Sequence, residues 1–145
     1  MGFTCRKFSS EDFEQWCALY EGYLSFYEAT LSEESKAIVW KRLLSGEIQG
    51  LGAFESDALV GIAHFHVQMS TWADDGHLYL EDLYVAETAR NRGVARALIE
   101  AIESEAKSER CSEMYWITRE SNSTARRLYD SMARLSDFVR YEIKL

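Results

Sequence analysis

The stretch from residue 77 to residue 103 constrains the fold of this chain more than any other part of the sequence. Residues 77–85 are largely apolar and predict a strand. Gly93 follows in a turn, and from Val94 and Leu98 onward apolar residues recur at the spacing of one helix face. A strand that leads through a glycine turn into an amphipathic helix is typical of α/β proteins.

The other predicted elements extend this unit into one mixed α/β domain. No proline, repeat or low-complexity segment divides the 145 residues, so we expect a single domain over 1–145. Helices are predicted after Ser9 or Ser10, over 33–44, from about residue 93, and after Ser121 or Asn122. Strands are predicted over 3–8, 50–55, 59–69, 77–85, 114–118 and 138–143. The expected order is β-α-α-β-β-β-α-β-α-β.

The charge balance limits the classes of partner. A net charge of −8 and a pI of about 4.9 disfavour nucleic acid, whose phosphates an acidic surface repels. No apolar run approaches the ~18 residues of a membrane span, and no signal peptide is apparent at the N-terminus. We therefore expect a cytoplasmic protein without a nucleic-acid or membrane partner. The acidity suits a cationic small molecule or a basic peptide, although solubility alone also explains it.

The cysteines and histidines do not predict a metal site. The three cysteines lack a C-x-x-C spacing, so neither a disulfide framework nor a zinc ribbon is indicated. His64 and His66 share one face of a predicted strand, and His77 begins a neighbouring one. Because no fourth ligand has a suitable spacing, we expect no metal.

The turn before the predicted helix has the properties of an anion site. Residues 90–96 read RNRGVAR, so we expect Arg90, Arg92 and Arg96 to surround one spot at this turn. Backbone N–H groups and the helix dipole attract an anion at such a turn, and Gly93 permits its close approach. A pyrophosphate fits this description, but so does a plain turn with solvated arginines. Neither a Walker loop nor G-x-G-x-x-G is present.

Two motifs resemble those of the GNAT superfamily of N-acetyltransferases. The first is LYLEDLYV at 78–85 followed by RxxGxA at 90–95, and the second is YWITRESN at 115–122 followed by ARRLY at 125–129. The resemblance implies a mixed, mostly antiparallel twisted sheet flanked by helices, and acetyl-CoA as the cosubstrate. Within the superfamily, the YLED run is similar to diamine acetyltransferases. The YWxTxExN run is similar to a group that acts on histones, polyamines and D-amino acids.

The resemblance also implies where the cosubstrate binds. The pantetheine arm pairs with the backbone of the strand, and the pyrophosphate takes the amides of the turn. The implied cofactor-binding residues are Leu83, Tyr84, Val85, Arg90, Asn91, Arg92, Gly93, Val94, Ala95, Arg96, Asn122 and Tyr129. Many relatives have glycine at the positions of Asn91 and Ala95, but the amides remain.

Catalysis is expected by direct attack of a free amine on the thioester in a ternary complex. The resemblance gives Tyr129 the role of protonating the departing sulfur, and a phenol with a pKa of about 10 holds its proton at pH 7. Glu81, or Asp82 beside it, would accept the proton of the amine. Because the two alternate along an apolar strand, we expect only one of them to face the interior or a cleft. A backbone N–H, that of Val85, would stabilise the oxyanion.

The first two predicted helices are acidic and aromatic, which suits a cationic acceptor. The proposed substrate-binding residues are Glu28, Tyr27, Trp72 and Asp82, with Glu33, Tyr23 and Phe26 as further candidates. Core packing remains the alternative for each aromatic residue. We thus expect an N-acetyltransferase for a small cationic primary amine such as a polyamine. The alternatives are a lysine or N-terminal protein acetyltransferase, an amino-acid N-acetyltransferase, and a non-catalytic acyl-CoA sensor. A homodimer is expected from the resemblance.

Overall fold

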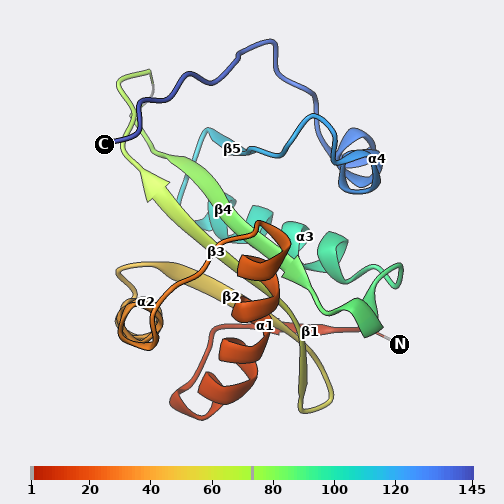
Figure 1. The fold of residues 1–145 in the computed structure, drawn as a ribbon. Helices are drawn as coiled ribbons and strands as arrows, with labels where there is room; N and C mark the ends of the chain where they lie inside the picture. Colours follow the sequence, from red (N-terminus) through yellow and green to blue (C-terminus); the bar gives the residue numbers. More distant parts are fainter. Residues whose placement is uncertain (1, 73) are drawn as a thin grey trace.

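Five strands form one open sheet in the order β1-β2-β3-β4-β5 (Figure 1). The computed structural model describes residues 2–72 and 74–145. Its strands are β1 (Thr4–Arg6), β2 (Gln49–Glu55), β3 (Ala58–Gln68), β4 (His77–Val85) and β5 (Glu113–Trp116). Neighbouring strands are antiparallel except β4 and β5, which are parallel. The predicted mixed, mostly antiparallel α/β fold is confirmed.

The helices lie on both faces of this sheet. They are α1 (Phe13–Phe26), α2 (Glu33–Ser45), α3 (Val94–Ser108) and α4 (Ser123–Met132). Short 3₁₀ turns, Ser10–Asp12 and Glu87–Ala89, precede α1 and α3. Helices α1 and α2 cover one face of the sheet, α3 covers the other, and α4 follows β5 near the end of the chain (Figure 1).

Each face of the sheet has its own apolar core. On the side of α1 and α2, Trp16 and Trp40 pack against residues of β2 and β3 such as Ile62. On the side of α3, Leu98 packs with Phe65 and other strand residues. Because successive strand residues point to opposite faces, β3 contributes to both cores and is buried along most of its length.

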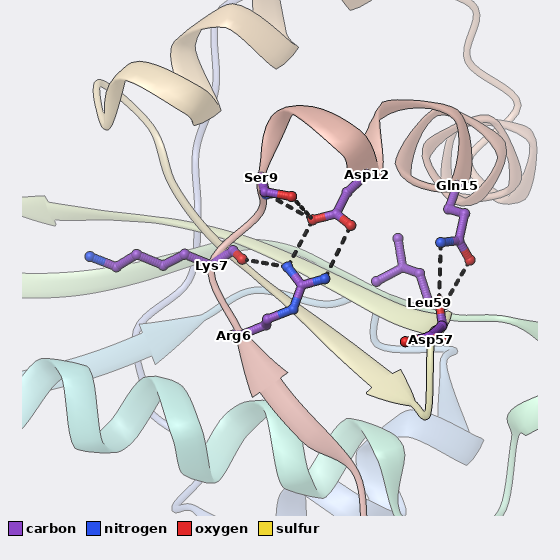
Figure 2. A network of polar contacts seen from close by, with 7 residues as sticks. All are labelled: Arg6, Lys7, Ser9, Asp12, Gln15, Asp57 and Leu59. Atoms are coloured by element: carbon purple, nitrogen blue, oxygen red, sulfur yellow. Dashed lines mark hydrogen bonds and ion pairs between the residues drawn. The ribbon is translucent and has the colours of Figure 1, made fainter.

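An ion pair fixes β1 to the start of α1 (Figure 2). The Arg6 guanidinium donates to both carboxylate oxygens of the buried Asp12, at 2.8 and 3.1 Å. The backbone N–H of Ser9 also donates to Asp12, at 2.7 Å. These hydrogen bonds, those of Arg6 above all, hold the pKa of Asp12 below its usual value. Gln15, one turn later, bonds Leu59 and so ties α1 to the β2–β3 hairpin.

The strand predicted over residues 138–143 is not formed. After α4 the chain runs to residue 145 without helix or strand, and Phe138, Tyr141 and Ile143 are exposed (Figure 1). The local alternation of apolar residues resembles a strand, but a strand also needs a neighbour for its N–H and C=O groups. In the described sheet β5 pairs only with β4, so this segment adds nothing to it.

Gly61 on β3 sets how closely α3 can approach the sheet. A Cβ atom at this position would lie 2.8 Å from Val94 Cγ1 and 3.0 Å from Leu98 Cδ1, both in the fully packed core. We expect Gly61→Ala to lower the free energy of unfolding by about 1–3 kcal/mol, because overpacking displaces α3. Urea denaturation measures this change. Gly2→Ala is the control, since nothing lies within 4 Å of its added Cβ. Equal midpoints for the two variants would contradict this packing.

Candidate active site

Strands β4 and β5 separate halfway along β4. Their parallel ladder joins residues 77–80 to residues 113–116 and ends there. Strand β4 continues to Val85, with β3 on one side and no strand of the described residues on the other. The backbone N–H and C=O groups along this edge of residues 81–85 can therefore pair with an extended ligand.

A pocket lies at the point of separation. Its lining comes from the C-terminal half of α1, from β4 and β5, from the loop after β5 and from α4: Tyr23, Tyr27, Leu80, Glu81, Leu83, Trp116, Ile117, Thr118 and Tyr129. The structure thus brings together five residues that the sequence proposed for the site, namely Tyr23, Tyr27, Glu81, Leu83 and Tyr129. Ile117 and Thr118 were not predicted, because nothing in their sequence shows that β5 ends beside β4.

A β-bulge places Glu81 and Asp82 on the same face of the sheet. The register of β3 and β4 shifts by one residue after His64, so that Glu81 is the extra residue on β4. His64 Nδ1 lies 2.8 Å from Asp82 Oδ2, and His66 Nε2 lies 2.5 Å from Glu81 Oε1. Since the two histidines share the α1 face of β3, both carboxylates point that way. The expectation that the two would alternate is wrong, because the bulge interrupts the alternation.

The two carboxylates differ in their surroundings. The Asp82 side chain is 15% exposed, whereas that of Glu81 is 47% exposed and lines the pocket. Burial, and then the negative charge of Asp82, raise the pKa of the neighbouring Tyr23 phenol. Burial likewise raises the pKa of Tyr20 to about 12, with smaller contributions from Asp82 and Glu81. Both phenols therefore stay protonated at neutral pH and can donate hydrogen bonds.

Tyr129 reaches the pocket from α4. Its ring packs edge-to-face on Trp116, with 5.3 Å between the centroids. Burial raises the pKa of its phenol above the ordinary value, and the nearby Tyr27 adds to the shift. A phenol with a raised pKa is neutral at pH 7, so Tyr129 carries a proton into the pocket.

The turn before α3 exposes backbone amides. Gly93 has φ of 87° and Asn91 has φ of 61°, a region that glycine enters freely and asparagine tolerates. The N–H groups of Val94, Ala95 and Arg96 belong to the first helical turn and have no acceptor within the helix. Nothing lies within 4 Å of a Cβ added to Gly93, which leaves this end of the helix open to an anion.

The three arginines of this turn do not gather around it. The Nε of Arg90 donates to the carbonyl oxygen of Val85 at 3.2 Å. Arg92 pairs with Glu55, and Arg96 donates to Ser131 Oγ at 2.9 Å. The expected cluster of three guanidinium groups is therefore not formed here, and the backbone amides are the better anion donors.

The remaining predicted residues lie in the loop before α4, in the α1 core and at the surface. Asn122 precedes α4, and its Nδ2 donates to Thr118 Oγ1 at 3.1 Å, which orders a loop that lines the pocket. Tyr84 points away from α3 and packs in the α1 core. Glu28 and Trp72 are exposed and lie outside the pocket lining, Trp72 in the loop between β3 and β4.

Among the further substrate candidates, Glu33 has another partner. Glu33 Oε1 lies 2.8 Å from the Nζ of the buried Lys36 within α2, and Lys36 also pairs with Glu21 of α1. The charge of Glu33 is thus paired inside α2. Residues 2–72 and 74–145 contain no cluster of three histidine, cysteine or carboxylate groups that suits a metal ion. No helix in the described part of the chain is long and apolar enough to cross a membrane.

The separated strands, the open helix N-terminus and the protonated tyrosine are features that the resemblance to N-acetyltransferases leads us to expect. The family model described as "Acetyltransferase (GNAT) family" matches residues 16–133. That match covers most of the chain, so the protein belongs to the GNAT acetyltransferase family and is an N-acetyltransferase. The resemblance stated from the two motifs is confirmed.

Individual relatives agree with this assignment. The chain is 31% identical over 136 residues to the D-amino-acid N-acetyltransferase HPA3 of Saccharomyces cerevisiae, covering 91% of this chain and 84% of that protein. It is 29% identical over 85 residues to the thialysine N-epsilon-acetyltransferase of Caenorhabditis elegans, covering 59% of this chain and 52% of that protein. A solved structure described as a probable acetyltransferase is 26% identical, with a TM-score of 0.87 over 100% of this chain and 98% of that one. AAC(6')-Iy, solved with a bisubstrate analogue, shares the fold at 18% identity, with a TM-score of 0.85 over 100% of this chain and 99% of that one.

Proposed function

We propose that the protein transfers the acetyl group of acetyl-CoA to a primary amine bound in the pocket where β4 leaves β5. The observation that carries this proposal is that one pocket contains a carboxylate, Glu81, and a protonated phenol, Tyr129. The first can accept a proton and the second can donate one. Acetyl transfer to an amine needs both.

The proposed binding mode of acetyl-CoA uses backbone groups. The free edge of residues 83–85 suits the amide groups of the pantetheine arm, which would extend the sheet by one strand. The open N-terminus of α3, with the amides of Val94, Ala95 and Arg96, suits the pyrophosphate. Arg90, Asn91, Arg92 and Gly93 shape this turn, and Asn122 orders the loop on the other side of the pocket.

The proposed reaction is a direct transfer. The amine gives a proton to Glu81, directly or through water, and its nitrogen forms a bond to the thioester carbonyl carbon. A backbone N–H on the free edge of β4, with Val85 as the candidate, stabilises the oxyanion. The C–S bond then breaks, the Tyr129 phenol protonates the departing sulfur, and the nitrogen gives its second proton to the resulting phenolate. The products are an N-acetyl amine and a free thiol.

A small cationic amine is the acceptor that the charges of the site favour. Glu81 and Asp82 present two carboxylates on one face, and the rings of Tyr23 and Tyr27 line the pocket beside them. An ammonium group is attracted both by carboxylates and by aromatic faces. Glu28 and Trp72 would contact only an acceptor that extends beyond the pocket.

An amino acid is the second candidate acceptor. The Arg119 guanidinium lies 5.2 Å from the centre of the Tyr27 ring, and no carboxylate of the described residues lies within ion-pair distance of it. A cation at the edge of the pocket suits an acceptor that carries a carboxylate as well as an amine. The names of the two curated relatives, which refer to D-amino acids and thialysine, favour the same class. The cytoplasmic location stays a prediction.

A thiol-release assay with acetyl-CoA tests the function directly. The acceptors are spermidine, spermine, short diamines, amino acids of both hands and a lysine-rich peptide. We expect turnover on a small amine, and for a polyamine we expect kcat/KM to fall as salt rises, because salt screens the attraction to the acidic pocket. Turnover on the peptide alone would favour a protein acetyltransferase. Tight binding of acetyl-CoA without thiol release on any amine would contradict the proposal and favour the sensor.

Replacing Tyr129 tests the proton donor. We expect Tyr129→Phe to lower kcat by about 10²-fold or more, because the departing thiolate loses its acid, while the Kd for acetyl-CoA stays within about twofold. Stopped-flow thiol release and calorimetry measure the two quantities. Tyr115→Phe is the matched control, since this hydroxyl bonds Gln68 outside the pocket. An unchanged kcat in Tyr129→Phe would exclude the phenol as the donor.

We also propose that the protein is a homodimer in which the segment after α4 packs against a second copy. Tyr141 and Ile143 are 91% and 86% exposed and alternate like residues of a strand. The outer edge of β5 has no neighbour among the strands of the described chain. A second copy that covers both would remove an exposed apolar run and an open strand edge.

Light scattering tests the dimer. We expect the protein to have twice the 16.7 kDa mass of the chain at micromolar concentration, and the double variant Tyr141→Ser, Ile143→Ser to have the mass of one chain. Ile38→Ser on α2 is the control, because Ile38 is half exposed and lies outside this segment. A wild-type protein that is monomeric at 100 µM would overturn this arrangement.

A further inference from the structure

His64 is a buried histidine with a specific partner on each ring nitrogen. It lies on β3 and is 2% exposed, between Trp16 of α1 and Asp82 of β4. The indole Nε1 of Trp16 lies 3.0 Å from His64 Nε2. His64 Nδ1 lies 2.8 Å from Asp82 Oδ2. The three side chains thus form a continuous network of hydrogen bonds from the α1 core to Asp82, the residue after the pocket-lining Glu81.

Trp16 determines where the proton on His64 lies. An indole N–H can only donate a hydrogen bond, so Nε2 of His64 must accept it and carries no proton. A neutral imidazole then has its single proton on Nδ1, and this N–H donates to the Asp82 carboxylate. The opposite tautomer would set two N–H donors against each other at 3.0 Å and leave Nδ1 facing a carboxylate without a proton between them. The direction of both hydrogen bonds, from Trp16 to His64 and from His64 to Asp82, therefore follows from the indole of Trp16.

The same geometry leaves neither ring nitrogen of His64 free to contact a ligand. Nε2 accepts from the fully buried Trp16, and Nδ1 donates to Asp82. His64 therefore acts on the site through Asp82 alone.

The neighbouring Glu81–His66 pair differs from the Asp82–His64 pair in its burial. Glu81 and His66 form a second carboxylate–histidine pair on the same face, but the His66 ring has no tryptophan behind it and is 30% exposed. Glu81 is 47% exposed and pairs with a partly exposed histidine, whereas Asp82 is 15% exposed and accepts a hydrogen bond from a buried histidine. The bulge thus presents one exposed and one mostly buried carboxylate side by side.

We propose that His64, locked by Trp16 in its Nδ1–H tautomer, is a positioning residue that fixes the Asp82 carboxylate toward the acceptor amine. An oriented carboxylate binds an ammonium group without the entropic cost of being ordered, and it leaves Glu81 to accept the proton. The tautomer of His64 does not depend on the proposed function. The role of Asp82 in acceptor binding rests on the proposed function.

The tautomer can be measured on the wild-type protein without any ligand. Long-range ¹H–¹⁵N correlation spectra of histidine-labelled protein at pH 7 distinguish Nδ1–H from Nε2–H, and the spectrum of His64→Gln assigns the signal among the three histidines. We expect His64 to be in the Nδ1–H form. An Nε2–H signal would overturn the proposal.

Two variants of His64 separate its two hydrogen bonds. In His64→Asn the amide nitrogen takes the place of Nδ1 and can still donate to Asp82. In His64→Gln the amide reaches the place of Nε2, keeps an acceptor for Trp16 and removes the N–H that His64 donates to Asp82. Both variants remove the same ring, but His64→Asn is the shorter side chain and also leaves the buried Trp16 indole without its acceptor, so a general loss of packing would harm His64→Asn more than His64→Gln.

The kinetics of the two variants decide the positioning role. We expect kcat/KM for the acceptor to be about tenfold lower in His64→Gln than in His64→Asn, mainly through KM, with equal KM for acetyl-CoA in both. Equal acceptor kinetics, or a loss confined to acetyl-CoA, would overturn the role. Acetylation of an amine by a protein whose His64 is in the Nε2–H form would leave the proposed function standing and refute this inference. Failure to acetylate any amine, with the Nδ1–H tautomer present, would refute the proposed function and the role of Asp82 but not the hydrogen-bond chain.

Discussion

The site depends on the early end of the parallel ladder between β4 and β5. The two strands pair over four residues each, and β4 then continues alone to Val85. An unpaired strand edge inside a domain is unfavourable unless something bonds to it. Here the edge borders a pocket whose other walls come from α1 and α4, so the same separation that leaves the backbone free also makes room for an acceptor. Tyr129 and Glu81 line the same pocket at the point where β5 has ended.

A second constraint concerns the two carboxylates on β4. In a regular strand Asp82 would point to the face of the sheet that packs against α3, as Leu78 and Leu80 do, and an unpaired charge buried in that core is costly. The bulge after His64 turns both Glu81 and Asp82 to one face, and each finds a histidine there. The raised pKa of Tyr23 follows from burial and from the negative charge that this arrangement concentrates. The acidity of the pocket is therefore a property of the backbone geometry as much as of the residue types.

Much of the architecture could be predicted from local patterns. The strand over 77–85 and the glycine at the start of α3 were predicted where the structure has them, since a buried strand and an amphipathic helix leave strong periodic signals. The segment over 138–143 has the same alternation and yet forms no strand, because alternation reports which side chains are apolar and not whether a partner strand is present. The arginines of the turn were expected around one anion, but Glu55 and Ser131 hold two of them. These contacts join residues distant in sequence.

The sequence by itself determined the family, the order of most elements and the identity of the groups that can carry protons, because these depend on residue type and on spacing within a few residues. Tertiary structure alone decided which of those groups meet. It placed Tyr129 beside Trp116 and in one pocket with Glu81. It left Glu28 and Trp72 outside that pocket, and it brought the Trp16 indole into hydrogen-bond contact with His64. The physical reason is that a bulge, the end of a ladder and the donor facing a histidine are set by how distant segments pack. Local sequence patterns do not predict how distant segments pack.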